Sequence, residues 1–368
     1  MSLLAMLGWL DAPELSVETP RPATLSELLT AHSLPYIQAV QTAQSIARGE
    51  RPPADLRIYG LGIEDNPLFP SMHEAPALLA GASIQAMQAV LEGRAVHAYS
   101  PAGGMHHAMR ARAAGFCIYN DIVVAIAAAL AQDRRVAYVD LDAHHGDGVQ
   151  AAFYDDPRVL TVSVHESGEF LYPGTGEASE TGMGEGRGAC INVPLPPHSG
   201  DDSILLAYDR IVEPALVAYA PDIIVTQTGC DTHHADPLTD LAGTMRLYPA
   251  LAARTHAIAH RICAGRWLIV GGGGYDPADV TPRAWTAFMG TVLGHQVDGV
   301  VLPAGWRIAS EAKGGHPPLH LLDDPEAPAP RAPDPSFVAS LDRIEAEVLA
   351  ALRKRFAGES ATSIEGAD

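Results

Sequence analysis

The feature that most constrains this chain is the stretch at residues 136–148, where an apolar run ends in a cluster of ionisable groups. Residues 136–139 are apolar or aromatic and include two valines, which is typical of a buried strand. Three carboxylates and two imidazoles follow within residues 140–147. Burying several carboxylates is costly unless a metal ion or close pairing compensates them. A surface loop rich in Asp and His is the alternative, but the apolar strand that leads into it favours a buried site.

Two residues of this stretch have the spacing of metal ligands. Asp142 and His144 lie two apart, so in an extended segment their side chains project to the same side. An oxygen and a nitrogen ligand suit a divalent metal such as zinc. Asp231, after another predicted strand, would complete three protein ligands and leave one position open for water, whose pKa a zinc ion lowers to about 7. On its own, Asp231 could equally cap a helix.

Apolar strands and helical segments alternate along the chain. This pattern predicts an α/β fold with a single mostly parallel sheet and helices on both faces. Ligands of such sheets bind beyond the carboxyl ends of the strands. Unusual polar residues follow five predicted strands at that end, which indicates one active site. These residues are His106 and His107, the run 140–147, residues 163–165, Asp231 and Tyr275.

The expected strands span residues 56–62, 95–100, 136–140, 159–164, 223–228 and 267–270, and the expected helices span 24–44, 74–92, 118–131, 204–219, 247–264 and 278–293. Thr24 and Glu27 predict a capping box, and Pro214 predicts a kink. The proline-rich residues 317–335 indicate a linker, and residues 337–356 an amphipathic helix. We therefore expect a domain at residues 1–310, a linker at 311–336, and a C-terminal helix and tail at 337–368.

Composition restricts the partners and the compartment. The 368 residues carry 24 basic and 44 acidic side chains, a formal net charge of −20. Nucleic acid is not an expected partner, because phosphate contacts need a basic face. Four cysteines without paired spacing fit a reducing compartment. The N-terminus lacks the basic segment of a signal peptide, and no apolar run approaches the roughly 18 residues of a membrane span. We expect a cytoplasmic protein that binds no membrane.

His106 and His107 follow a Gly-Gly turn, which lets the backbone approach a ligand closely. Two neutral imidazoles near a water on a metal are suited to carry protons. Each would need a carboxylate to fix its tautomer, and Asp140 and Asp147 are the candidates. Two solvent-exposed histidines on a loop are the alternative.

Four consecutive glycines, residues 271–274, precede Tyr275. They would let the Tyr275 phenol reach into a crowded site and stabilise an oxyanion. A glycine-rich loop can also hold a phosphate. No Lys followed by Ser or Thr comes after this loop, as a P-loop requires.

These blocks, in collinear order over about residues 20–305, resemble the signature motifs of the zinc-dependent histone deacetylases, and in particular the bacterial acetoin-utilisation type. They are residues 101–108 (PAGGMHHA), 115–117 (GFC), 139–148 (VDLDAHHGDG), 172–176 (YPGTG), Asp231 ahead of 236–238 (DPL), and 271–275 (GGGGY). The resemblance implies the arginase–deacetylase fold. It implies a hydrolase that cleaves the N-acetyl amide of acetyl-lysine in proteins or peptides.

The resemblance also implies two metal ions. Zinc is expected on Asp142, His144 and Asp231, with ferrous iron as an alternative that the ligand types do not exclude. A structural potassium ion is expected near the ends of two neighbouring strands. Its surroundings would be Asp140, Asp142, His144, Ser163 and Val164.

The catalytic groups that the resemblance implies are two carboxylate–histidine pairs and a phenol. The pairs are His106 with Asp140 and His107 with Asp147, and Tyr275 would polarise the amide carbonyl. We expect His107 to be the principal general base and acid, and His106 to act mainly through its charge.

Three residues are expected to bind the substrate. They are Gly115, Phe116 and Tyr172, whose two aromatic rings would flank a tunnel for an aliphatic stem. Two features depart from the family pattern. The chain is expected to begin after the family's first edge strand and its His-Pro-Glu-like segment. The pair His233-His234, close to Asp231, has no assigned role, and the oligomeric state is not determined.

Three other functions are open to such a sequence. Ureohydrolases share the fold class but bind two manganese ions, and they would need carboxylates at the positions of Gly146 and His233. A non-catalytic protein that binds acetyl-lysine or a metabolite is disfavoured because all expected catalytic residues are present. An acetylpolyamine amidohydrolase, which acts on a small acetylated amine, shares the catalytic residues and is the main alternative.

Overall fold

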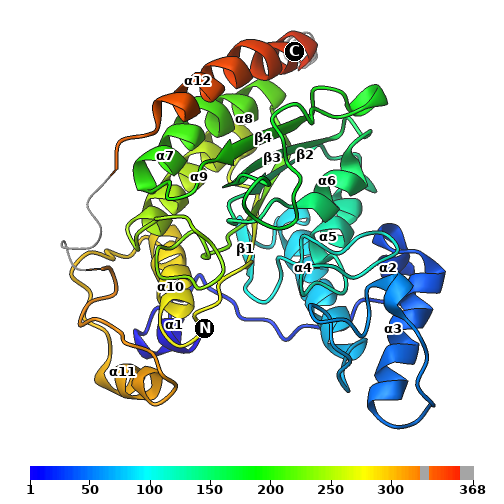
Figure 1. Ribbon diagram of the computed structural model, residues 1–368. Helices are drawn as coiled ribbons and strands as arrows, with labels where there is room; N and C mark the ends of the chain where they lie inside the picture. Colours follow the sequence, from blue (N-terminus) through cyan, green and yellow to red (C-terminus); the bar gives the residue numbers. More distant parts are fainter. Residues whose placement is uncertain (324–330, 357–368) are drawn as a thin grey trace.

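The computed structural model describes residues 1–323 and 331–356. These residues contain a six-stranded sheet with the strand order β1-β6-β5-β2-β3-β4, and every neighbouring pair is parallel (Figure 1). The strands are β1 (His97–Ser100), β2 (Val136–Asp140), β3 (Val159–Glu166), β4 (Cys190–Leu195), β5 (Ile223–Gln227) and β6 (Trp267–Val270). The expected α/β fold with one parallel sheet is confirmed.

Helices cover both faces of the sheet. One hydrophobic cluster includes side chains from α2 (Leu25–Ala31), α3 (Leu34–Ala47), α4 (Glu74–Leu91), α5 (Asp121–Leu130) and α6 (Asp147–Phe153). The other includes side chains from α1 (Ser2–Met6), α7 (Asp201–Ala207), α8 (Glu213–Tyr219), α9 (Leu247–Cys263), α10 (Val280–Val292) and α11 (Ala304–Glu311). The sheet is therefore the middle layer of three.

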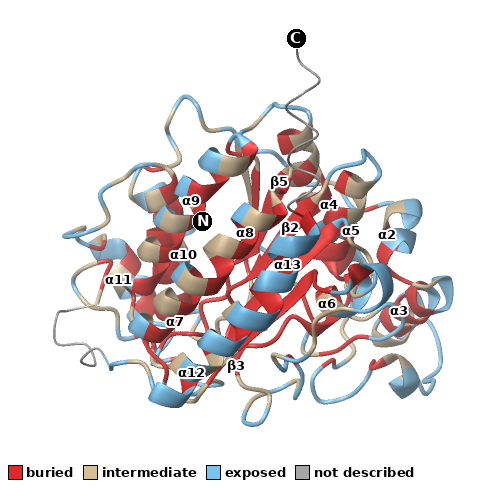
Figure 2. Cartoon of the chain, turned by 90° about the horizontal axis from the view of Figure 1, so that it is seen from above, coloured by how far each residue is buried: buried red, intermediate tan, exposed pale blue. Residues whose placement is uncertain are grey.

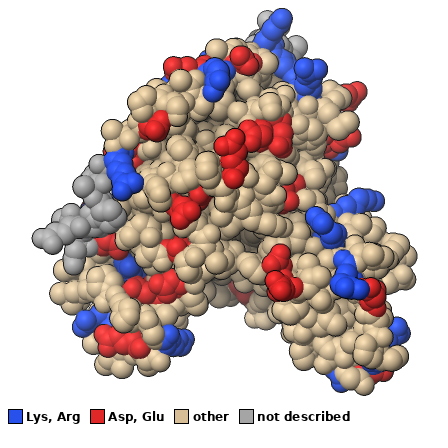
Figure 3. Space-filling view, viewed as in Figure 1, with Lys and Arg blue, Asp and Glu red and all other residues tan. Residues whose placement is uncertain are grey.

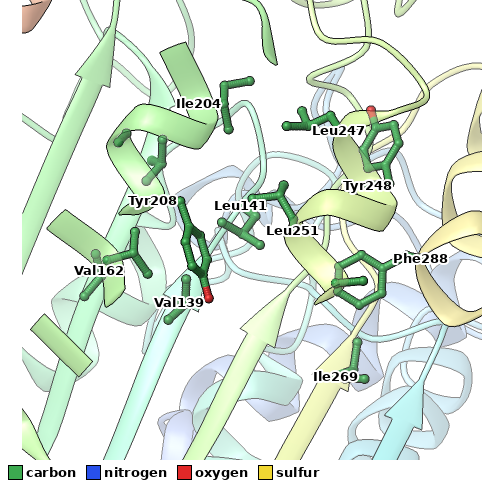
Figure 4. Packing of buried hydrophobic residues seen from close by; sticks show 14 of the residues in the cluster. Val139, Leu141, Val162, Ile204, Tyr208, Leu247, Tyr248, Leu251, Ile269 and Phe288 are labelled. Atoms are coloured by element: carbon green, nitrogen blue, oxygen red, sulfur yellow. The ribbon is translucent and has the colours of Figure 1, made fainter. Parts of the chain in front are cut away.

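The strands are apolar on both sides because both sides are covered. In β2, Ala137 and Val139 pack into one cluster, whereas Val136 and Tyr138 pack into the other. Figure 4 shows the cluster that contains Val139, whose side chain lies beside Tyr208, while Ile269 of β6 lies beside Phe288 of α10. Two packed faces fix the register of each strand, because a shift by one residue would exchange the faces of all its side chains.

The first expected helix differs from the structure. Residues 24–44 form the two helices α2 and α3, since His32 is extended at φ −118° and ψ 152°. A continuous helix is excluded by Pro35, which lacks the N–H needed for the helical hydrogen bond and would clash with the preceding turn. The capping box is confirmed: the Thr24 hydroxyl accepts the Glu27 amide, and the Glu27 carboxylate accepts the Thr24 amide.

Two strand assignments also change. The strand expected at residues 56–62 is wrong, because this segment contains a 3₁₀ turn, Arg57–Tyr59, closed by Gly60 at φ 69°. The strand β4 was not predicted. It contains Pro194 and pairs only with β3, at the edge of the sheet, where a residue without an N–H is tolerated. In the helix expected at 204–219, a π-helical turn, Tyr208–Val212, directly precedes the segment with Pro214.

The expected C-terminal helix is confirmed. It comprises α12 (Pro335–Ile344), a π-helical turn (Glu345–Leu349) and α13 (Ala350–Phe356), and its inner face is buried while its outer face is exposed (Figure 2). Arg210 donates hydrogen bonds to Asp342 and Glu345 of this helix. Within the predicted linker, Leu321 and Leu322 are buried, and residues 324–330 lie outside the described residues, as do 357–368 of the tail. The division into domain, linker and helix stays a prediction.

Two further observations concern the surface. Within residues 1–323 and 331–356, no helix has the length and apolar character to cross a membrane. Figure 3 shows one face of the molecule, on which basic side chains are dispersed among acidic ones and do not gather into a patch.

Candidate active site

The three predicted metal ligands meet at the carboxyl ends of neighbouring strands. Asp142 and His144 follow β2, and Asp231 follows β5, which pairs directly with β2. The Nδ1 of His144 is 2.8 Å from Oδ2 of Asp231 and 3.1 Å from Oδ1 of Asp142. One ligand atom of each residue lies within 4.8 Å of the others. The tertiary structure therefore assembles the predicted set from two distant parts of the chain.

The buried negative charge of this trio favours a bound cation. Asp142 and Asp231 are both 0 % exposed, and in the described part of the chain neither forms an ion pair with Lys or Arg. Burial and the charge of Asp142 raise the pKa of Asp231. Burial also opposes a charge on His144, but the two carboxylates outweigh it and raise the pKa of His144 to about 11. The His144 imidazolium thus compensates the carboxylates when nothing else does.

A divalent metal would replace that proton, because a histidine nitrogen binds a metal only when it is deprotonated. Two carboxylates and one imidazole are donors that zinc and ferrous iron both accept. The buried negative charge and the donor types of the trio therefore fit the expected metal ion.

The carboxylates are held in place by groups that the sequence analysis missed. Gln227, the last residue of β5, donates to Oδ2 of Asp142 at 2.5 Å, and the amide of Gly273 donates to the same atom at 2.7 Å. The amide of Ala143 donates to Oδ1 of Asp231 at 2.9 Å. Gly273 must lack a side chain, since a Cβ there would lie 2.1 Å from Oδ2 of Asp231. Such outer contacts orient metal ligands.

The two predicted carboxylate–histidine pairs are present. The Nδ1 of His106 is 2.8 Å from Oδ2 of Asp140, and the Nδ1 of His107 is 2.8 Å from Oδ1 of Asp147. Both imidazoles are 3 % exposed, so they are not surface histidines on a loop. Their Nε2 atoms are 3.0 Å apart and turn toward a common space. The carboxylates occupy both Nδ1 atoms, which leaves Nε2 as the nitrogen available for proton transfer.

The two histidines differ in charge. Burial disfavours the charged form of His106, but Asp140 and Asp142 outweigh it and raise its pKa to about 9. Burial and the neighbouring charge of His106 lower the pKa of His107 to about 4, despite its pairing with Asp147. At neutral pH His107 is therefore the neutral member of the pair, and His106 the charged one.

The loop that carries these histidines is held by the start of α5. The buried carboxylate of Asp121 accepts the amides of Gly104 at 3.0 Å and Met105 at 2.8 Å. Asn120 donates to the carbonyl of Ala108 at 3.1 Å. In the sequence, this Asn-Asp pair resembles an ordinary helix start, so only the structure reveals its contact with the loop.

Tyr275 lies beside the predicted metal ligand His144. Its ring centroid is 6.1 Å from that of His144 and 5.9 Å from that of Phe116. The Tyr275 backbone amide donates to Oδ2 of Asp236 at 2.8 Å, which fixes the turn after the glycines. Burial raises the pKa of the Tyr275 phenol, so it is protonated at neutral pH and can donate a hydrogen bond. Its hydroxyl has no hydrogen-bond partner among the described residues.

The predicted substrate-binding residues border the site. Phe116 is 54 % exposed and Tyr172 is 43 % exposed. The Tyr172 ring centroid is 5.0 Å from that of His107. Gly115 has φ +48°, and a Cβ there would lie 2.4 Å from Cδ2 of His107 and 3.0 Å from Cε1 of Tyr172. The aromatic rings are thus at the solvent side of the catalytic groups, and a tunnel between them stays a prediction.

The residues expected around potassium lie beside the metal ligands. Asp140 of β2 is the register partner of Ser163 in β3. The amide of Asp142 donates to Oδ1 of Asp140 at 3.2 Å, and the Ser163 hydroxyl is 2.8 Å from Nδ1 of His165. The neighbouring Val164 is buried. This proximity is compatible with the predicted potassium ion, which stays a prediction.

The pair His233-His234 follows Asp231 closely in the sequence. The Nε2 of His233 is 3.0 Å from Oδ2 of Asp323, and its other ring nitrogen accepts a backbone N–H. Arg283 donates to the second oxygen of Asp323 at 3.0 Å. His233, His234 and Arg283 are among the residues that line a cavity of about 410 Å³. His233 is thus paired with Asp323, and His233, His234 and Asp323 each offer a ligand atom within 4.8 Å of the others.

Comparisons with known proteins agree with this geometry. The sequence model of the histone deacetylase domain matches residues 1–292. The acetoin utilization protein AcuC of Bacillus subtilis (strain 168) is 43 % identical over 319 residues, which cover 82 % of this chain and 81 % of that protein. The AcuC protein of Staphylococcus xylosus is 36 % identical over 305 residues, covering 83 % and 78 %. That of Staphylococcus aureus (strain MRSA252) is 38 % identical over 297 residues, covering 80 % and 75 %. The chain belongs to the histone deacetylase family.

Proposed function

We propose that this protein is a metal-dependent deacetylase that hydrolyses the N-acetyl amide of acetyl-lysine in proteins or peptides. The observation that carries the proposal is the juxtaposition of a buried acidic ligand set with two carboxylate-paired histidines. Membership of the histone deacetylase family supports deacetylation as the reaction class. The relatives named above are acetoin utilization proteins, and their name does not specify a substrate.

Asp142, His144 and Asp231 are the proposed ligands of zinc or ferrous iron. When bound, the metal supplies a Lewis acid and makes water a better nucleophile at neutral pH. The proposed potassium ion would bind beside Asp140 and Ser163 and stabilise the segment that carries two of these ligands.

The histidines are the proposed proton carriers. His107 is the neutral ring, and its Nε2, which lies 3.0 Å from the Nε2 of His106, carries a lone pair; it accepts the proton of the attacking water and later donates one to the leaving amine. The Asp147 carboxylate holds the His107 tautomer with the proton on Nδ1. His106 keeps its charge through Asp140 and contributes a fixed positive field next to the reacting atoms.

Tyr275 is the proposed donor to the carbonyl oxygen. Negative charge builds up on this oxygen as the amide carbon becomes tetrahedral. A protonated phenol donates one hydrogen bond there and brings no charge that would repel a cation. The unpartnered hydroxyl of Tyr275 supports this role.

The substrate is proposed to be an uncharged acetamide at the end of an alkyl stem. The half-exposed rings of Phe116 and Tyr172 provide apolar surface for such a stem at the solvent side of the site. A stem that ends in a polypeptide would place its bulk outside these rings. An acetylated polyamine has the same acetamide and stem, so it is the alternative substrate.

The deciding measurement is kcat/KM for an acetyl-lysine peptide and for N-acetylputrescine, with the protein loaded separately with zinc and with ferrous iron. We expect the peptide to be preferred. The Asp231→Asn variant provides the background rate, because it lacks one proposed ligand. A large preference for N-acetylputrescine would make the protein an acetylpolyamine amidohydrolase, and absence of acetate release from both substrates with either metal would contradict a deacetylase.

A further inference from the structure

Three histidines converge at the amino end of the sheet, opposite the candidate active site. His97 is the first residue of β1, and His256 and His260 lie on α9. The Nε2 of His260 is 3.2 Å from Nε2 of His97 and 3.1 Å from Nε2 of His256. We call these residues the tri-histidine cluster. None of them belongs to the proposed deacetylase site.

The fold builds this cluster from distant parts of the chain. In the register of β1 and β6, His97 is the partner of Trp267, whose side chain packs in the hydrophobic cluster that α9 also joins. His97 is therefore on the face of the sheet that α9 covers. His256 and His260 are four residues apart, so they share one face of this helix.

The turn after α9 makes room for the cluster. Gly265 has φ +78°, and a Cβ at this position would lie 2.9 Å from Cε1 of His260 and 2.6 Å from the side chain of Val96. A larger residue would displace the His260 ring. The sequence at the turn is thus compatible with an imidazole that packs closely against the start of β1.

Hydrogen bonds alone satisfy this arrangement poorly. A neutral imidazole has one N–H and one acceptor nitrogen, so a given Nε2 either donates or accepts. The Nε2 of His260 faces two other Nε2 atoms and has a single proton or a single lone pair to share between them. Three imidazole nitrogens within 4.8 Å of one another are better explained by a common cation.

The spacing matches that of metal ligands. A tetrahedral metal with metal–nitrogen bonds of about 2.0–2.1 Å keeps its ligand nitrogens about 3.3 Å apart. The separations of the His260 Nε2 from the other two Nε2 atoms, 3.1 and 3.2 Å, are close to that value. Three imidazoles with one open position are also a known ligand set for zinc.

The donor types and charge states favour particular metals. Burial and the neighbouring imidazoles lower the pKa of His97 to about 4, and the same causes lower the pKa of His256. These rings are neutral at pH 7, which is the form that binds a metal. Imidazole suits zinc, nickel and copper, whereas calcium and magnesium require oxygen ligands.

We propose that His97, His256 and His260 form a second divalent-metal site that takes zinc, nickel or copper. The ion joins the edge strand β1 to α9 and thereby stabilises an edge strand of four residues. His260 is exposed, so the fourth coordination position faces solvent and takes water or a small external ligand. The site does not depend on the proposed deacetylase function.

The test is metal analysis of the untagged full chain after equilibration with excess zinc and removal of free metal. We expect close to two ions per chain in the wild type and one in the His256→Gln/His260→Gln double variant. The Asp231→Asn variant should retain the ion of the tri-histidine cluster. His316→Gln, which changes an exposed histidine outside the cluster, is the matched control and should bind as the wild type does.

Stability supplies a readout that is separate from activity. Nickel added to the wild type loaded with one equivalent of zinc, which the acidic set takes first, should raise the midpoint of thermal unfolding, because an ion that binds only the folded state stabilises it. The double variant should lose this rise and keep its deacetylase kcat, which also shows that it is folded. Should it fail to fold, the single variant His260→Gln, altered at an exposed side chain, is expected to bind nickel at least about tenfold more weakly by calorimetry. Equal metal content, or equal nickel affinity, in variant and wild type would overturn the proposal.

Discussion

The two ends of the sheet both gather candidate metal ligands, but in opposite electrostatic settings. At the carboxyl ends, Asp142 and Asp231 are fully buried and face each other across His144. At the amino ends, the tri-histidine cluster is partly exposed and contains no acid. The first set needs a positive charge in order to be stable when buried, whereas the second has no carboxylate charge to compensate.

The two sets also differ in the hydrogen bonds that neighbouring groups make to their side chains. Around the acidic ligands, Gln227 and Gly273 hold one carboxylate in a fixed orientation. In the tri-histidine cluster, the buried Nδ1 of His97 has no hydrogen-bond partner among the described residues. Outer hydrogen bonds typically change metal affinity by about 10–100-fold. A buried, oriented, charged set should therefore hold its ion more tightly than the set of three histidines does.

The largest expected effect tests the acidic set. The Asp231→Asn variant should lose the metal at the carboxyl ends and its activity should fall to background, since one of three ligands is neutralised. Activity and metal content are measured on the same sample, after equilibration with zinc. Retention of both would show that Asp231 is not a ligand and would remove the contrast between the two ends.

The same variant has a pH-dependent signature in the metal-free protein. Because the folded-state pKa of Asp231 is raised above its unfolded value, ionising it costs stability progressively as the pH rises above about 4. Asparagine removes this cost. Thermal unfolding in the presence of a chelator should therefore show the variant to be at least as stable as the wild type at pH 8, with a smaller advantage at pH 5.

The next effect separates the two catalytic histidines. His107→Ala should lower kcat by about 10²–10⁴, the usual contribution of a general acid–base group, while metal content stays unchanged. His106→Ala should lower kcat less, because the charged ring is proposed to act through its field. Both variants need metal analysis as the control. A nearly normal kcat in His107→Ala together with an inactive His106→Ala would reverse the two roles.

The smallest effect concerns a group that is a ligand in neither metal set. Tyr275→Phe should lower kcat by about 10²–10³ with little change in KM, because the phenol is proposed to donate its bond mainly in the transition state. The metal content of both sites should be that of the wild type. If kcat is unchanged, Tyr275 only packs against Phe116 and His144, and the donor to the carbonyl oxygen is another group.

Local sequence patterns predicted most of the fold and the main site. The strand before Asp140 is apolar on both faces, as expected for a strand covered by helices on two sides, and the alternation of strands and helices indicated a parallel sheet. The predictions of secondary structure were wrong where local sequence patterns conflict with packing. Pro194 obscured the edge strand β4, and a favourable helix pattern hid the break at His32 before Pro35.

The sequence by itself determined which groups are the candidates for the chemistry, because Asp142 and His144 are neighbours in one strand end and His106 and His107 are adjacent. Only the tertiary structure decided what surrounds them. Gln227 reaches Asp142 across 85 residues of chain, and His97 and His260 meet across 163. Such contacts depend on strand register and helix packing, which arise from the burial of whole faces and leave no local pattern at the residues that they bring together.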